Sequence, residues 1–150
     1  QTITILNQID YPCFIFGNVT TPNIPYLKKL KSFAHNHITF IINEPREKLL
    51  ELLSQSKIFF SASKETFGIA TVESIASGCV PIVPDNSANK EVVPILGCRY
   101  ESGLDAIHLI NDVMDSDNEV ILNILSDHIK NYTYDKFEKN FLYSIKQVMV

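Results

Sequence analysis

Short apolar runs alternate with longer amphipathic stretches along most of the chain. Apolar residues dominate positions 13–16, 38–42, 58–60 and 79–83, and a shorter run lies near 98–100. A strand with one solvated face alternates apolar and polar residues, whereas a strand buried on both faces is apolar throughout. The runs therefore predict strands that are buried on both faces, as in a parallel sheet.

The stretches between these runs have the spacing of helices. Ile24, Leu27, Leu30 and Phe33 recur every three residues, which predicts an amphipathic helix over residues 23–34. The other predicted helices begin near Pro45 or cover residues 68–77, 103–114, 117–130 and 135–149. Regular alternation of strands and helices indicates parallel β-α-β units. The predicted fold class is α/β, a doubly wound parallel sheet flanked by helices, with further helices at the C-terminal end.

The two ends of the chain carry separate expectations. Residues 2–9 fit a helix placed before the first strand, but the alternation Thr-Ile-Thr-Ile within them also fits a strand. The segment 132–141 is rich in Tyr and Phe, and we expect it to pack against the domain. Because no linker, repeat or charge block interrupts the chain, residues 1–150 are expected to form a single domain.

Composition narrows the class of protein. The chain has 150 residues, of which 45% are hydrophobic and 20% charged, which is typical of a folded domain rather than a disordered chain. A net charge of −4 argues against a nucleic-acid partner, since such proteins are usually basic. No apolar run approaches the roughly 18 residues that a transmembrane helix requires.

The cysteines and histidines suggest neither a disulfide framework nor a metal site. Cys13, Cys79 and Cys98 are odd in number, lie in or beside apolar segments and lack the spacing of metal ligands. We expect them to be buried, reduced thiols, which fits a cytoplasmic location. The four histidines have no carboxylate partner at a recognisable spacing, so no metal is predicted.

The loop after residues 58–60 carries the most specific chemistry. In open parallel sheets ligands bind beyond the carboxyl ends of the strands. Glu65 lies in this loop, just before a helix that opens at Phe67 and Gly68, and Glu73 follows eight residues after Glu65. A helix start offers free N–H groups and a positive dipole end, which suit an anionic ligand. A solvated or capping role is the alternative for either carboxylate.

The segment from Ser61 to Pro81 resembles a known family. Its Glu-x7-Glu pattern, formed by Glu65 and Glu73 and flanked by Phe67-Gly68, is similar to that of the retaining nucleotide-sugar glycosyltransferases of the GT-B fold, specifically the GT4-like group. In that group the pattern lies in the Rossmann-like C-terminal domain, which binds the donor. Two weaker similarities are Gly17-Asn18, which stands where the family has a Gly-Asp turn, and Glu91, in a Glu-Val-Val segment.

The resemblance implies transfer of a sugar from a nucleotide-diphospho-sugar to an acceptor with retention of configuration. It implies that Glu65 is the catalytic carboxylate and bonds hydroxyls of the donor sugar, and that Glu73 holds the ribose hydroxyls. The remaining donor-binding residues that it implies are Thr66, Phe67, Gly68, Ile69, Gly17 and Asn18. The nucleotide sugar is the substrate, and no cofactor or metal is implied.

One departure from the family pattern bears on activity. The family uses an Arg and a Lys after the first strand of this domain, and residues 1–9 contain no such pair. We expect that strand and its basic loop to lie upstream of residue 1, in a two-domain enzyme whose N-terminal domain binds the acceptor. Residues 2–6 or another copy of the domain then fill the place of the strand. The 150 residues alone are expected to be inactive, and any association with a membrane would be peripheral, through the N-terminal domain.

The alternatives to a glycosyltransferase function are a non-catalytic binding or assembly domain and a nucleotide-sugar epimerase.

Overall fold

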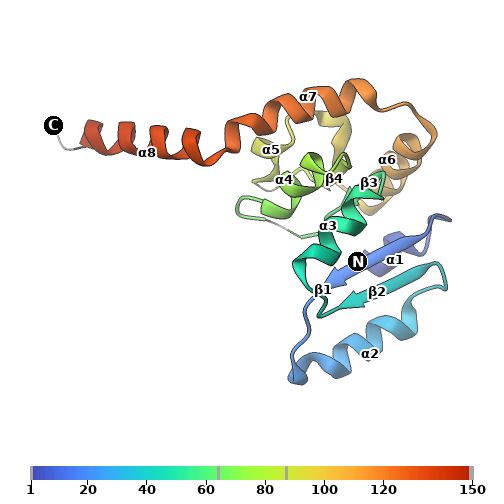
Figure 1. Ribbon diagram of the computed structural model, residues 1–150. Helices are drawn as coiled ribbons and strands as arrows, with labels where there is room; N and C mark the ends of the chain where they lie inside the picture. The colour runs from blue at the N-terminus through green and yellow to red at the C-terminus, as the bar shows by residue number, and fades with distance from the viewer. Residues whose placement is uncertain (1, 64, 87, 149–150) are drawn as a thin grey trace.

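The computed structural model describes residues 2–63, 65–86 and 88–148 (Figure 1). All described strands pair in parallel: β1 Cys13–Gly17, β2 Ile38–Ile42, β3 Ile58–Phe60, β4 Val80–Pro84 and β5 Arg99–Tyr100. The α-helices are α1 Thr2–Leu6, α2 Ile24–Phe33, α3 Arg46–Ser54, α4 Ile69–Ala76, α5 Asn89–Val92, α6 Gly103–Asp115, α7 Glu119–Ile129 and α8 Tyr134–Val148. Short 3-10 helices cover Thr21–Asn23, Leu96–Cys98 and Lys130–Tyr132. The predicted α/β class is confirmed, and the first segment is a helix rather than a strand.

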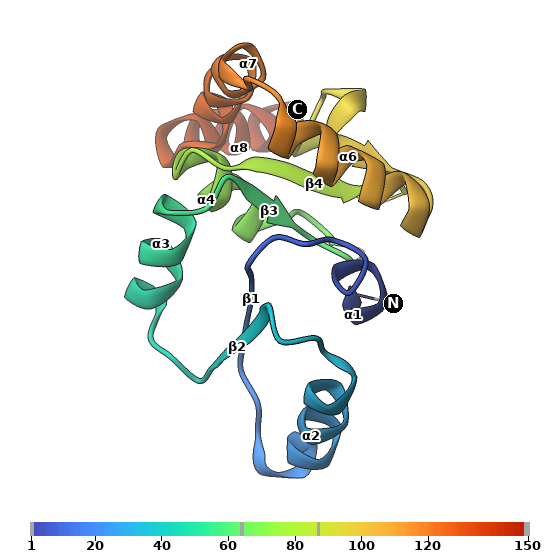
Figure 2. The same ribbon diagram turned by 90° about the vertical axis from the view of Figure 1, so that its right-hand side faces the viewer.

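The strands form two separate sheets (Figures 1 and 2). β1 pairs with β2 from Cys13 opposite Ile38 to Gly17 opposite Ile42. β4 lies between β3 and β5 in the second sheet. Among the described residues no strand joins β1 to β3, so the single sheet expected from the alternation of elements is divided between these two strands.

Burial differs strongly between the two sheets. Every residue of β4 is buried, as a strand covered on both faces requires. β1 and β2 are mostly half-buried, and the side chain of Phe14 is 51% exposed. The prediction of burial on both faces is therefore wrong for β1 and β2. These two strands pair only with each other among the described elements, and α2, which contains no buried residue, follows β1.

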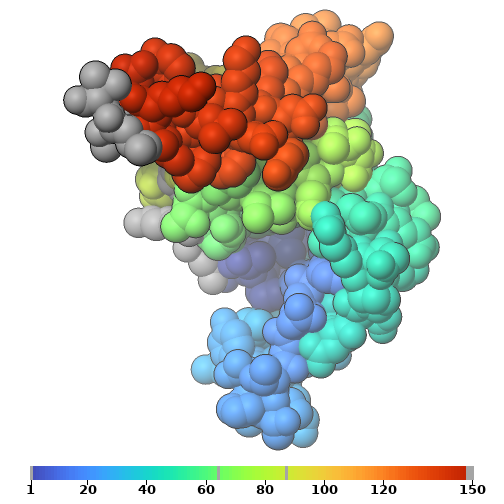
Figure 3. Space-filling view, turned by 60° about the vertical axis from the view of Figure 1, so that its left-hand side comes forward, coloured from blue at the N-terminus to red at the C-terminus, as the bar shows by residue number. Residues whose placement is uncertain are grey.

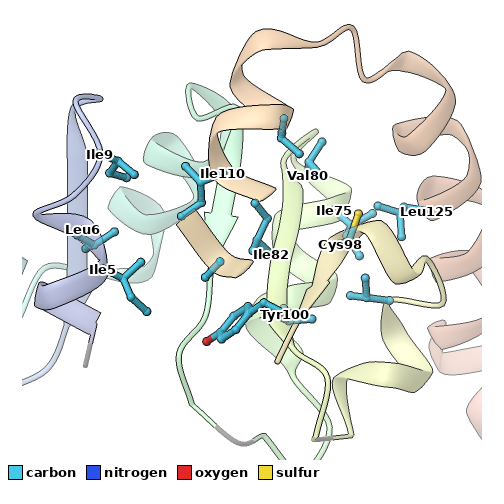
Figure 4. Packing of buried hydrophobic residues seen from close by; sticks show 14 of the residues in the cluster. Ile5, Leu6, Ile9, Ile75, Val80, Ile82, Cys98, Tyr100, Ile110 and Leu125 are labelled. Carbon is cyan, nitrogen blue, oxygen red and sulfur yellow. The ribbon is translucent and has the colours of Figure 1, made fainter. Parts of the chain in front are cut away.

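The main core surrounds β4 (Figure 4). Ile110 of α6 lies on one side of this strand, and Ile75 of α4 and Leu125 of α7 lie on the other. α6 contacts β3, β4 and β5, while α4 packs against β4 and α7. α1 also contacts α6 and adds Ile5 and Leu6 to the same core. The β3-β4-β5 sheet is thus covered by helices on both faces, which fixes the ends of its strands.

The C-terminal helix α8 projects from the body of the protein (Figure 1). Phe137 and Phe141 stack on each other with ring centroids 5.8 Å apart, yet both side chains are more than half exposed. The expectation that residues 132–141 pack is wrong for the part that lies in α8. Tyr132, just before α8, is half-buried and does contact the domain.

Candidate functional site

A pocket of about 230 Å³ lies at the carboxyl end of β3 and the start of α4. Its lining residues are Phe59, Ser61, Glu65, Thr66, Phe67, Gly68, Ile69, Ala70 and Thr71. Five of the residues that the family resemblance implies, 65–69, therefore lie together. In Figure 3 this segment (green) is at the surface below α8 (red), and α3 (teal) occupies the same face.

Gly68 determines how α4 begins. Its φ of +91° lies in the left-handed region that side chains disfavour. A Cβ at this position would also stand 2.5 Å from Oδ1 of Asn89, a buried residue. The carbonyl of Gly68 accepts from the amides of Thr71 (3.0 Å) and Val72 (3.1 Å), which closes the first turn. Only glycine fits here without a shift of Asn89, so residue 68 couples the pocket to α5.

Glu65 lines the pocket with an exposed side chain. Its Oε1 accepts a hydrogen bond of 2.6 Å from the hydroxyl of Ser63, and its main-chain carbonyl accepts from the amide of Ala88 at 3.3 Å. In the described structure no side chain caps the start of α4, so Glu65 does not have the capping role considered from the sequence. Its carboxylate and the start of a helix face one pocket, an arrangement suited to hydroxyl groups beside an anion.

Glu73 lies outside the pocket lining but on the adjacent surface of α4. Residues three and four apart on a helix are neighbours, so Glu73 follows Ala70 and Ile69, both of which line the pocket. The Glu73 side chain is 19% exposed, and its Oε1 forms an ion pair with Arg46, the first residue of α3. The Glu73 side chain is thus turned toward the start of α3 rather than toward open solvent. Arg46 was not predicted as a site residue.

Gly17 and Asn18 lie at the carboxyl end of β1, away from the pocket lining. The carbonyl of Gly17 accepts from the amide of Asn43 at 3.0 Å. The Asn43 side chain pairs twice with the backbone of Val19, at 2.7 and 3.0 Å. These contacts join the loop after β1 to the loop after β2. The structure therefore does not bring Gly17 and Asn18 together with Glu65.

His128 and Tyr132, near the C-terminal end, form a cluster that contacts the pocket-lining residue Phe67. The carbonyl of Glu91 accepts hydrogen bonds from Nε2 of His128 (2.6 Å) and the hydroxyl of Tyr132 (2.7 Å). The ring of Tyr132 meets that of Phe67 edge to face, with centroids 5.4 Å apart. Burial, and then the nearby charge of Glu91, raise the pKa of Tyr132 above its ordinary value of 10.0, so its hydroxyl remains a donor at neutral pH. The sequence gives no spacing signal for this cluster.

A larger cavity of about 410 Å³ lies at the other ends of the same strands. Lys57 and Gly78, which precede β3 and β4, line it together with residues 116–119. The amine of Lys57 already donates to the carbonyls of Met114 (2.8 Å) and Ser116 (3.0 Å). Ligands of open parallel sheets bind at the carboxyl ends, so we assign the site to the smaller pocket.

Within residues 2–63, 65–86 and 88–148, no three or more His, Cys, Asp or Glu side chains cluster as metal ligands would. No helix among these residues is both long and apolar enough to span a bilayer.

The fold and the pocket together define a Rossmann-like α/β domain with a carboxylate-bearing pocket where a helix follows a strand. The profile of the family described as Glycosyl transferases group 1 matches residues 2–100. The chain therefore belongs to the group 1 glycosyl transferases, and the resemblance to this family is confirmed. No curated protein sequence matches the chain.

Proposed function

We propose that this domain binds a nucleotide-diphospho-sugar for transfer of the sugar to an acceptor. The observation that carries the proposal is the pocket in which the Glu65 carboxylate and the start of α4 meet at the carboxyl end of β3. Sugar hydroxyls would donate to Glu65, and the diphosphate would accept from backbone N–H groups around Gly68 and Ile69. Glu73 would accept from the ribose hydroxyls.

The proposed chemistry requires no nucleophilic side chain. As the bond to the diphosphate breaks, negative charge grows on the leaving group and positive charge on the sugar. The N–H groups at a helix start stabilise the first, and the Glu65 carboxylate stabilises the second by bonding the sugar hydroxyls. We include retention of configuration, a metal-free reaction and an acceptor held by another domain of the same enzyme in the proposal, since the resemblance implies all three.

The pocket favours transfer over epimerisation. An epimerase needs acid and base groups on both sides of the carbon that it inverts. Glu65 is the one acid among the pocket-lining residues, and no histidine is among them. Thus the lining offers a carboxylate for binding hydroxyls but no acid–base pair.

Calorimetric titration with UDP- and GDP-sugars and with the bare nucleotides tests the proposal. We expect Glu65→Ala to lower the affinity for the cognate nucleotide sugar about tenfold, the effect of roughly 1.4 kcal/mol, and to leave the bare nucleotide nearly unchanged. Glu73→Ala should weaken both ligands. Glu101→Ala, at an exposed position outside the pocket, is the matched control. Heat from no nucleotide would reject donor binding, and binding without sugar release in the presence of acceptors would indicate a non-catalytic binding domain.

A further inference from the structure

Arg46 and Glu73 form an ion pair between two helices that are distant in sequence. Arg46 begins α3, directly after the loop that follows β2, and Glu73 lies in the middle of α4. The guanidinium of Arg46 meets Oε1 of Glu73, and the side chains are 68% and 19% exposed respectively. The described structure shows no other hydrogen bond or ion pair for either charged group. The two charged groups therefore interact only with each other among the described residues, and the ion pair fixes the direction of Oε1 of Glu73.

The backbone that carries Arg46 is itself held in place. Asn43 has a φ of 58° and pairs through its side-chain amide with both backbone groups of Val19. Pro45 then caps α3 in an extended conformation. The two Asn43–Val19 hydrogen bonds hold the loop before α3 against the loop after β1, so the backbone near Arg46 has support besides the ion pair.

The Arg46–Glu73 pair differs from the exposed ion pairs of the protein in where it lies. Exposed ion pairs typically contribute roughly 0–1 kcal/mol, because water screens the charges and the side chains lose freedom. Lys48 and Glu51, also on α3, form such a pair with both side chains exposed. In contrast, Glu73 is mostly buried and lies one helical turn from the pocket-lining residues Ile69 and Ala70. Holding a carboxylate at that place affects what can bind beside it.

We propose that Arg46 is a positioning residue that orients Glu73 toward the vicinal hydroxyls of the nucleoside; this inference rests on the proposed function. A carboxylate has two oxygens and about four acceptor sites. Arg46 occupies one site on Oε1 and leaves Oε2 to accept from the diol. It also neutralises Glu73, so that an anionic nucleotide does not approach two uncompensated carboxylates. The class of ligand recognised here is a ribonucleotide rather than a deoxy sugar nucleotide.

The test compares each ribonucleotide with its analogue that lacks the diol. UDP and GDP, and their 2′,3′-dideoxy forms, are titrated into the full chain and into Arg46→Ala, Arg46→Lys and Glu73→Ala. We expect Arg46→Ala to lower ribonucleotide affinity about fivefold to tenfold and to leave the dideoxy affinity unchanged within twofold. Arg46→Lys should restore part of the loss, since an ammonium keeps the charge but not the planar fork. Lys48→Ala, which removes a neighbouring cation on the same helix, should have no effect.

The outcomes separate this inference from the proposed function. If Glu73→Ala removes the preference for ribonucleotides over their dideoxy forms, Glu73 binds the ribose hydroxyls. An equal loss of this preference in Arg46→Ala then supports the positioning role of Arg46. If Glu73→Ala removes the preference but Arg46→Ala does not, the positioning role is rejected and the proposed function stands. If Arg46→Ala weakens both forms equally, Arg46 acts on the diphosphate and the inference is overturned. If Glu73→Ala changes nothing while the nucleotides still bind, the ribose role of Glu73 is rejected. Circular dichroism melting of each variant checks that the fold is retained.

Discussion

Cys79 and Cys98 are fully buried thiols on either side of the central strand β4 in the chain. The Cys79 thiol contacts two main-chain carbonyls as a donor, those of Leu53 (3.1 Å) and Ser56 (3.3 Å). Burial raises the pKa of each thiol from 9.0 to about 11. The expectation of buried free thiols is confirmed for these two residues, while Cys13 is half-buried.

These pKa values predict a loss of stability in alkali. Unfolded thiols ionise near pH 9 while the folded ones keep their protons to about pH 11, so the stabilisation is present below pH 9 and is lost as the pH rises toward 11. We expect the free energy of unfolding to fall by on the order of 1 kcal/mol per thiol between pH 8 and pH 10. Urea unfolding at both pH values measures it. The variant Cys98→Ala should show a smaller fall than the parent chain, and an identical fall in both would contradict the argument.

Among single residues of the site, some could be predicted from the sequence and others could not. Glu65, Phe67 and Gly68 are consecutive or nearly so, and their place after an apolar run predicts a strand end and a helix start. Arg46 lies 27 residues from Glu73, and no periodicity relates two residues on different helices. Tertiary packing brings such pairs together, so their pairing appears only in the structure.

At the scale of elements, the start of α6 has the best-defined cap. The hydroxyl of Ser102 accepts from the amide of Asp105 at 3.2 Å, and the Asp105 carboxylate accepts from the amide of Ser102 at 2.9 Å. This reciprocal arrangement satisfies two N–H groups that a helix start leaves free. α6 covers the β3-β4-β5 sheet, so its start affects the stability of the main core.

We expect Ser102→Ala to lower the free energy of unfolding by about 1 kcal/mol, the typical cost of losing a cap. Ser126→Ala, at an exposed position within α7, is the matched control and should change stability by less than about 0.5 kcal/mol. Urea unfolding of the two variants at pH 7 gives both values. Equal stability of the two variants would show that Asp105 alone suffices at this helix start.

Helix and strand positions follow closely from the apolar pattern, but short elements and caps do not. The predicted ranges 23–34 and 103–114 nearly coincide with α2 and α6. α5 has only four residues, too few to show a helical period, so it was not predicted. The Ser102 cap was missed because it uses Asp where the usual signature has Glu or Gln. For α8 the helical period is correct, but a period does not show whether a partner covers the apolar face.

At the scale of the whole molecule, the division between the two sheets was not predictable. Apolar runs indicate that a strand is buried, but they do not specify which strands are neighbours. The run 38–42 resembles the run 79–83 in apolar character, although β2 is half-exposed and β4 is fully buried. The difference arises from helices packed around β4 and from the absence of a described strand between β1 and β3.

This division predicts uneven local stability. The segment 13–42 buries Ile38 alone, whereas residues 79–84 and the helices around them carry most of the core. Regions with few buried apolar contacts open at lower free energy than the rest of a protein. We expect backbone amides of β1 and β2 to exchange with deuterium at least about tenfold faster than those of β4, a difference of roughly 1.4 kcal/mol in opening free energy. Hydrogen-exchange mass spectrometry at pH 7 measures this directly.

Two variants test whether the first sheet opens independently of the core around β4. Ile38→Ala removes the buried anchor of the first sheet and should speed exchange within 13–42 while leaving 79–84 unchanged. Ile82→Ala removes a fully buried side chain from the main core, at a cost of about 2–5 kcal/mol, and should speed exchange in both segments. The two results together would mean that the first sheet opens alone and that global unfolding requires loss of the core around β4. Equal acceleration of both segments by Ile38→Ala would instead mean that the two sheets open as one cooperative unit. Arg46, at the start of α3, follows the first sheet in the chain and pairs with Glu73. If residues 13–42 open independently, the frequency of that opening would therefore also determine how often the Arg46–Glu73 ion pair breaks.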